Sequence, residues 1–326
     1  MTASTEMKAT GKELPIVLDD RERSEVRALA AELTNVPPRL VDDAGWIALA
    51  RERSCALPLR LRQRLRRFRG DPDTDGLLHI QGLPVDPGRP TPVESGSVER
   101  HATAPASVLV LNALQLGEIV AFRAEKSGAL VQNVVPVPGQ ESQQSNAGST
   151  PLKMHVENAF HPNRPDFVAL LCLRADHERK AGLEIASIKE ALPLVSRADR
   201  EVLSEPRFRF DPPPSFNDAL GASASPVLTG APEDPDIRVD FASTHPLDDR
   251  AGSALAALEG ALCAVRKVIV LAAGDLAIID NRASLHGRTA FTPRYDGHDR
   301  WLQRTFIHLD DRRSRAARVN DGRVLS

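Results

Sequence analysis

The stretch LKMHVENAFHPNRPDFVALLCLR (residues 152–174) decides the expected fold. Its last part, residues 167–173, is an uninterrupted apolar run with the length of one buried strand. Its first part, residues 152–160, is also strand-like and carries the triplet His155-Val-Glu157. We therefore expect two consecutive strands, the first of which brings an imidazole and a carboxylate to one face of a sheet.

Further strands and helices are predicted on both sides of this stretch, without the regular alternation of strand and helix that parallel sheets show. The expected strands are residues 76–81, 267–272, 276–280 and 301–309. The expected helices are residues 21–33, 57–69, 107–122, 188–203 and 255–265. This pattern favours a mainly β fold, an antiparallel sandwich or barrel with flanking helices. We expect residues 1–17 to be a flexible N-terminus and residues 18–326 to form a single domain with an N-terminal helical elaboration.

Composition argues against several classes of function. The 42 basic and 44 acidic side chains leave a net charge of −2, which gives no general attraction to nucleic acid or anionic membranes. The arginine-rich segment 57–69 is interpreted as a solvated helix face. No apolar run has the length of a membrane span, and no secretory signal precedes the first helix, so a cytoplasmic location is expected. The three cysteines lack CxxC spacing and are expected to be reduced.

The sequence contains two triplets of the form His-x-acid, and about one is expected by chance in a chain of this composition. These are His155-Val-Glu157 and His308-Leu-Asp310. A facial triad of two histidines and one carboxylate, which suits Fe(II), needs another histidine from a distant strand. No histidine follows His308, whereas several follow His155, and His286 is the best placed of these.

Two arginines stand four residues apart near the last predicted strand, in HDRWLQRTF (residues 298–306). On one strand Arg300 and Arg304 would project to the same face, with their Cα atoms about 13 Å apart. Guanidinium groups form paired hydrogen bonds to carboxylates, so this spacing suits an acidic cosubstrate on one side and an amino-acid carboxylate on the other.

At this point the chain resembles the clavaminate-synthase-like Fe(II)/2-oxoglutarate-dependent oxygenases, a family that includes asparagine oxygenase and the arginine and lysine hydroxylases. The resemblance covers roughly residues 75–326. Its motifs are LLHIQGLPVDP (77–87), GSTPLKMHVENAFHPNRPDFVALLCLRADHE (148–178), PRFRF (206–210), DPDIRVDF (234–241) and GDLAIIDNRASLHGRTAFTPRYDGHDRWLQRTFI (274–307). It implies a double-stranded β-helix, or jelly-roll, core and an enzyme that uses Fe(II), 2-oxoglutarate and O2.

The resemblance also implies roles for individual residues. His155, Glu157 and His286 fall on the iron ligands, and Arg300 falls on the arginine that binds the distal carboxylate of 2-oxoglutarate. The implied substrate-binding residues are Arg304 for the α-carboxylate, Glu125 near the α-amine, Asn146 in an active-site loop and Asp240 at the substrate side chain.

One segment departs from the family pattern. Where relatives often carry a threonine that supports 2-oxoglutarate, this chain has Leu183-Glu184, so a hydrogen bond to the cosubstrate is expected to be missing or replaced.

The expected reaction is hydroxylation of a free L-amino acid at C3 or C4. The carboxylate ligand Glu157 favours a hydroxylase over a halogenase, and Asp240 favours a basic substrate of the arginine or lysine type. Three further functions stay open: an L-asparagine 3-hydroxylase, a hydroxylase of a carrier-tethered aminoacyl group, and a non-catalytic metal-binding sandwich. The sequence does not predict the oligomeric state.

Overall fold

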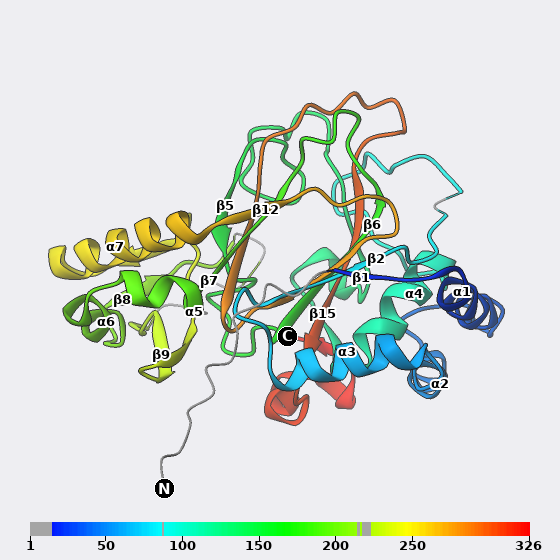
Figure 1. Ribbon diagram of the computed structural model, residues 1–326, viewed down its shortest axis with the longest axis horizontal. Coiled ribbons are helices and arrows are strands. Elements are labelled where there is room, and N and C mark those ends of the chain that lie inside the picture. The colour runs from blue at the N-terminus through cyan, green and yellow to red at the C-terminus, as the bar shows by residue number, and fades with distance from the viewer. Residues whose placement is uncertain (1–14, 87, 214–215, 217–222) are drawn as a thin grey trace, which may run out of the picture.

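Two β-sheets form the centre of the computed structural model, which describes residues 15–86, 88–213, 216 and 223–326 (Figure 1). The larger sheet contains, in order, β1 (Ile16–Val17), β2 (Leu77–Gln81), β13 (Leu276–Asp280), β6 (Phe167–Arg174), β15 (Trp301–His308), β3 (Glu118–Phe122) and β16 (Val324–Leu325), with β4 (Gln132–Val134) paired to β15. The smaller sheet contains, in order, β12 (Lys267–Ile269), β7 (Leu183–Ser187), β14 (Ser284–Arg288) and β5 (Leu152–His155). The expected mainly β fold with a jelly-roll core is confirmed.

Strand β6 shows why its sequence is apolar without interruption. Phe167, Ala169 and Leu171 belong to a core between the larger sheet and a layer of helices. Val168 and Leu170 alternate with them and belong to a second core, which lies between the two sheets. Because both faces of the strand are buried, no polar alternation remains in its sequence.

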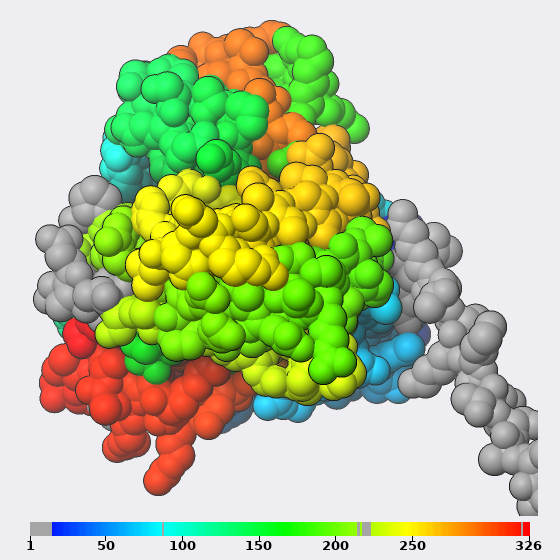
Figure 2. All heavy atoms as spheres, turned by 90° about the vertical axis from the view of Figure 1, so that its left-hand side faces the viewer, coloured from blue at the N-terminus to red at the C-terminus, as the bar shows by residue number. Residues whose placement is uncertain are grey.

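Helices cover the outer side of each sheet. The N-terminal helices α1 (Asp20–Thr34), α2 (Ala44–Ser54), α3 (Leu59–Gly70) and α4 (Ala104–Ala113) pack on the larger sheet. The helices α5 (Ile188–Ala191), α6 (Arg197–Leu203) and α7 (Asp249–Val265) pack beside the smaller sheet, and they occupy the face shown in Figure 2, in green to yellow. Two short antiparallel pairs, β8 (Phe208–Phe210) with β11 (Thr244–Pro246) and the hairpin β9 (Leu228–Ala231) with β10 (Asp234–Ile237), complete this side. Short 3-10 turns occupy Lys126–Gly128, Leu192–Leu194, Arg312–Ala317 and Val319–Asp321.

Several predicted boundaries are wrong. The helix predicted over residues 107–122 ends at Ala113, and its second half is strand β3, which pairs with β15. Gly117 separates the two elements, because a Cβ there would lie 2.1 Å from the carbonyl oxygen of His308. Close passage of β15 therefore overrides the local helical pattern.

Two predicted strands are clearly shorter than expected, and one structured segment lies in the predicted flexible N-terminus. The strand predicted over 152–160 ends at His155, and that over 267–272 ends at Ile269. Ile16–Val17 form β1, which pairs in parallel with β2, so the predicted flexible segment ends earlier than residue 17. Residues 1–14 lie outside the described residues.

The arginine-rich helix α3 buries one stripe and exposes its charges, as the solvated interpretation requires. Leu61, Leu65 and Phe68 are buried in the core. On the other side, Arg60 forms an ion pair with Glu22 at 2.5 Å. In the described ranges, no helix is both long enough and apolar enough to cross a membrane.

The contact between α3 and the larger sheet yields a stability prediction. The Phe68 ring lies 5.8 Å from the ring of Phe167 on β6, centre to centre, and Phe68 is fully buried. Phe68→Ala should lower the free energy of unfolding by about 3–5 kcal/mol in urea denaturation, because it opens a cavity between helix and sheet. The control Leu59→Ala, on the same helix and 61% exposed, should change it by less than about 0.5 kcal/mol. Equal effects of the two variants would contradict this packing.

Candidate active site

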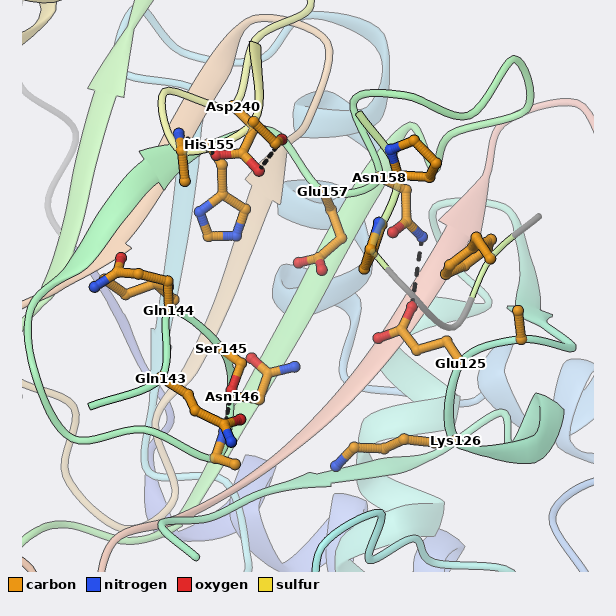
Figure 3. Close-up of a pocket in the computed structure, with 18 of the residues that line it drawn as sticks. Glu125, Lys126, Gln143, Gln144, Ser145, Asn146, His155, Glu157, Asn158 and Asp240 are labelled. Atoms are coloured by element: carbon orange, nitrogen blue, oxygen red, sulfur yellow. Dashed lines mark hydrogen bonds between the residues drawn. The ribbon is translucent and has the colours of Figure 1, made fainter. Parts of the chain in front are cut away.

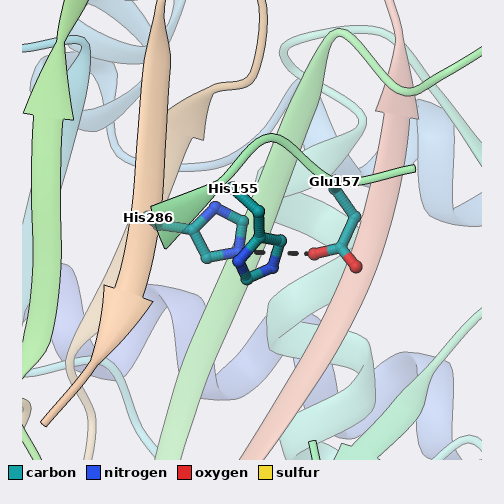
Figure 4. Close-up of side chains that lie close together, drawn as sticks. All are labelled: His155, Glu157 and His286. Atoms are coloured by element: carbon teal, nitrogen blue, oxygen red, sulfur yellow. Dashed lines mark ion pairs between the residues drawn. The ribbon is translucent and has the colours of Figure 1, made fainter. Parts of the chain in front are cut away.

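Two histidines and one glutamate converge between the sheets (Figure 4). His155 is the last residue of β5, and His286 lies directly opposite it on β14. Their ring centres are 4.5 Å apart, and His286 Nε2 lies 3.3 Å from Glu157 Oε2. One ligand atom from each of the three residues lies within 4.8 Å of the others. We call this group the metal centre.

Glu157 reaches the metal centre by a route that the sequence did not predict. It lies after the end of β5 rather than two residues along the same strand face, so the expectation of a shared strand face is wrong. The Asn281 side chain holds it there: Oδ1 accepts from the Glu157 backbone N–H at 2.7 Å, and Nδ2 donates to the Glu157 carbonyl at 3.1 Å. Asn281 is fully buried, so the turn is fixed from inside the protein.

The donor atoms of the metal centre fit a divalent metal. His155 Nδ1 donates to the Lys153 carbonyl at 2.8 Å, which leaves Nε2 free as a ligand. Glu157 Oε2 is buried and has no hydrogen-bond partner among the residues that the structure describes. Burial lowers the pKa of His286 and so favours the neutral imidazole that metals bind. Two neutral imidazoles and one carboxylate are the donor set of Fe(II) oxygenases.

The competing triplet has a different role. His308 is fully buried, and its Nε2 lies 3.1 Å from the Asn163 carbonyl while its Nδ1 lies 3.4 Å from the Ser314 hydroxyl. Asp310 is exposed. His308 is thus held by structural hydrogen bonds.

A second group of possible metal ligands consists of His177, Asp296 and Asp299. Their possible ligand atoms also lie within 4.8 Å of one another, but these atoms already bind one another and the backbone. His177 Nε2 lies 3.0 Å from Asp296, whereas its other ring nitrogen lies 3.7 Å from Asp299. Both carboxylate oxygens of Asp299 already accept backbone N–H groups. This group is therefore a hydrogen-bonded cluster around one imidazole.

A cavity of about 670 Å³ opens beside the metal centre. His155 and Glu157 line its inner end, and the predicted substrate-binding residues Glu125, Asn146 and Asp240 line its walls (Figure 3). Asn146 comes from the loop between β4 and β5, as predicted, and Glu125 follows β3. The structure therefore brings these residues, which are far apart in the sequence, to one cavity.

Arg304 is buried and joins the metal centre to the cavity wall. It is 2% exposed, donates to Glu157 Oε1 at 2.7 Å and to Gln132 Oε1 at 2.5 Å, and forms an ion pair with Glu125. With its amide oxygen turned toward Arg304, Asn146 accepts from both terminal nitrogens at 3.1 Å. This arginine is thus surrounded by acceptors.

The charge of Arg304 sets the protonation of its neighbours. The pKa of Glu157 lies well below its ordinary value. Burial by itself would raise this pKa, but the interactions with Arg304 and with the two histidines lower it by more. Burial raises the pKa of Glu125, and Arg304 opposes this only in part. The Glu157 carboxylate is therefore ionised, which is the form that a metal ligand needs.

Asp240 is held beside His155. Its backbone forms a β-bridge with His155, and its carboxylate accepts from the Ala242 N–H at 2.8 Å and the Ser243 hydroxyl at 2.7 Å. These bonds orient the carboxylate and leave lone pairs for one more donor. Asp240 therefore presents an oriented carboxylate at the cavity wall beside His155.

Arg300 lies just before β15 and is buried, 7% exposed, so both predicted arginines reach the interior. Arg288 on β14 is also buried, 4% exposed, and lies opposite Leu183 of β7. Glu184, the other departure from the family pattern, instead forms an ion pair with Arg266 at 2.9 Å.

Sequence reasoning missed three residues of the site: Gln132, Asn281 and Arg288. Asn281 had a detectable signal, because an amide directly after an apolar strand is unusual unless it binds backbone groups. Arg288 stands two residues after His286, where strand periodicity predicts the same face. Gln132 gave no such signal.

Comparison with known proteins agrees with this geometry. Residues 113–306 match the family described as "Taurine catabolism dioxygenase TauD, TfdA family". An L-asparagine oxygenase of Streptomyces coelicolor is 50% identical over 313 residues, which cover 95% of this chain and 94% of that protein. Clavaminate synthase 2 of Streptomyces clavuligerus is 34% identical over 304 residues, with 91% and 93% coverage.

Among solved structures, an asparagine oxygenase in complex with Fe(II), 2S,3S-3-hydroxyasparagine and succinate superimposes with a TM-score of 0.93. The two chains are 49% identical, and the match covers 96% of this chain and 99% of that chain. This chain therefore belongs to the TauD/TfdA dioxygenase family, in its clavaminate-synthase-like branch, and is an Fe(II)/2-oxoglutarate-dependent oxygenase.

Proposed function

We propose that the protein hydroxylates free L-asparagine at C3, with Fe(II) bound by His155, Glu157 and His286. The observation that carries this proposal is the single, oriented carboxylate of Asp240 beside His155, which suits one amide NH2 group. The related asparagine oxygenase, whose solved complex contains 2S,3S-3-hydroxyasparagine, supports the same substrate, carbon and stereochemistry.

The residues of the cavity hold the substrate by its charged end. When bound, Fe(II) and 2-oxoglutarate supply the oxidation of a C–H bond by O2, with succinate and carbon dioxide as coproducts. Arg304 binds the α-carboxylate and Glu125 the α-ammonium, so the zwitterion is fixed at two points. Asp240 and Asn146 then bind the side-chain amide, which leaves C3 facing the metal centre. Arg300 binds the distal carboxylate of 2-oxoglutarate.

The expectation of a basic substrate is less well supported than that of asparagine. The L-asparagine oxygenase is 50% identical to this chain, whereas an L-lysine 3-hydroxylase and an L-ornithine/L-arginine 3-hydroxylase are 34% and 30% identical. Asp211, another carboxylate of the cavity lining, is already paired with Arg209 at 2.8 Å and His245 at 3.1 Å, so it is not available to a basic side chain.

A carrier-tethered substrate and a role without catalysis are also less well supported. A carrier-tethered aminoacyl group has no free α-carboxylate, so it would leave the buried Arg304 without its substrate partner. A non-catalytic metal-binding sandwich does not agree with membership of an oxygenase family. Location in the cytoplasm stays a prediction.

An amino-acid screen tests the proposed substrate. Each of the twenty L-amino acids is incubated with the protein, Fe(II), 2-oxoglutarate and O2, while succinate release and a mass gain of one oxygen atom are measured. L-Asparagine should give the greatest release, with the hydroxyl group at C3 by NMR. D-Asparagine is the control, because Arg304, Glu125 and Asp240 together bind only one arrangement of the three groups around Cα. Faster turnover of arginine or lysine would refute the asparagine proposal.

The role of Asp240 is tested by Asp240→Asn. Loss of one charge-assisted hydrogen bond, about 1.5–3 kcal/mol, should lower kcat/KM for L-asparagine about 10- to 150-fold. Asp211→Asn, which changes the neighbouring carboxylate in the same way, should lower it less than about 3-fold, because Asp211 is expected to make no substrate contact. If both variants lose activity equally, Asp240 does not bind the substrate side chain.

The choice between the two His-x-acid triplets is tested by metal binding. His286→Ala should weaken Co(II) binding by about 10²-fold or more in an anaerobic titration followed by visible absorption, because a ligand is lost. Asp310→Asn should leave the titration unchanged, because Asp310 lies outside the metal centre. Retention of full affinity by His286→Ala would show that the metal is bound elsewhere.

A further inference from the structure

Arg288 and Arg300 form a buried pair of like charges, which we call the arginine pair. Their exposed fractions are 4% and 7%. Their guanidinium carbons lie 5.3 Å and 5.9 Å from the centre of the same ring, that of Phe291. Throughout the described ranges, neither guanidinium forms an ion pair with a carboxylate, in contrast to Arg304, which is paired with Glu125 and Glu157.

Few of the N–H donors of the arginine pair are used by the protein. Arg288 donates one hydrogen bond, from a terminal nitrogen to the Thr150 carbonyl at 3.0 Å. Its Nε is buried and has no hydrogen-bond partner within the described ranges. The guanidinium of Arg300 has no hydrogen-bond partner in the described part of the chain. Because each guanidinium has five N–H donors, the pair offers many unused donors in a buried place.

Uncompensated charge inside a protein is costly, and two neighbouring cations add repulsion to the cost of desolvation. A protein retains such a pair when a bound anion completes it. A free phosphate or sulfate ion could neutralise the arginine pair. The position of the pair relative to the metal centre, however, indicates which kind of anion binds.

Strand geometry places Arg288 on the same side as the metal ligand His286. The two residues are separated by Gly287 on β14, so their side chains point into the space between the sheets. The residue opposite Arg288 on β7 is Leu183, which offers no hydrogen-bond donor. An anion that is bound by the arginine pair can therefore be one end of a molecule whose other end binds the metal.

We propose that Arg288 is a second anchor for the distal carboxylate of 2-oxoglutarate, acting together with Arg300. This inference rests on the proposed role of Arg300 as a ligand of that carboxylate. It adds that the two arginines together select 2-oxo acids that carry a second carboxylate. Arg288 supplies from β14 the hydrogen bonds that Leu183 does not supply from β7.

Binding without turnover tests this proposal. The protein carrying Zn(II) in place of Fe(II) is titrated by calorimetry with 2-oxoglutarate and with 2-oxopentanoate, which has a methyl group instead of the distal carboxylate. Arg288→Met should raise the Kd for 2-oxoglutarate about 10- to 100-fold and leave the Kd for 2-oxopentanoate unchanged within about 2-fold. Arg288→Lys keeps the charge and should lie between wild type and Arg288→Met.

Thermal unfolding separates this role from a structural one. Without ligand, Arg288→Met should have a Tm no lower than that of the wild type, because it removes an uncompensated buried charge. The rise in Tm on adding 2-oxoglutarate should be smaller than in the wild type. If Arg288 merely holds the loop through Thr150, Arg288→Met should lower the ligand-free Tm and should raise the Kd for both 2-oxo acids by the same factor. This result would overturn the proposal.

Two further results distinguish the proposal from the function on which it rests. If Arg300→Met weakens 2-oxoglutarate binding and Arg288→Met does not, the second anchor is refuted while the proposed role of Arg300 stands. If the wild-type Zn(II) protein does not prefer 2-oxoglutarate to 2-oxopentanoate, the proposed role of Arg300 fails and the second anchor fails with it.

Discussion

The hydrogen bonds from the Asn281 side chain to the backbone of Glu157 are the constraint on which the site depends. Strand β5 ends at His155, and beyond it the chain turns rather than continuing along the sheet. Without a partner, the backbone groups of that buried turn would be unsatisfied. Asn281 satisfies them and also donates to the Pro165 carbonyl, so one side chain joins the turn, the segment before β6 and the end of β13.

This arrangement explains how a carboxylate outside the strand can meet two imidazoles on facing strands. His155 and His286 are opposite each other in the register of the smaller sheet, which brings their rings together without further help. Glu157 lies outside the paired strands, and its position depends on the turn that Asn281 holds. Strand pairing therefore positions the two histidines of the metal centre, and the hydrogen bonds of Asn281 position the glutamate.

Charge balance separates the interior into two regions. On the cavity side, Arg304 is neutralised by Glu157 and Glu125. On the other side, Arg288 and Arg300 share the Phe291 ring and have no carboxylate partner in the described part of the chain. A zwitterionic substrate suits the region around Arg304, because it carries one positive and one negative charge and leaves the net charge there unchanged. A carboxylate suits the region around Arg288 and Arg300, because its negative charge offsets their positive charge.

Local patterns and motifs were sufficient to predict the buried strand at residues 167–173, the three residues of the metal centre and the spacing of Arg300 and Arg304. That residues 118–122 form a strand could not be predicted in this way, because it depends on the close approach of His308 to Gly117. The position of Glu157 in the metal centre and the residues around Arg304 also depend on long-range contacts. These features come from contacts between segments more than a hundred residues apart, such as Asn281 with Glu157 and Arg304 with Gln132, and such contacts leave no periodic pattern in the sequence.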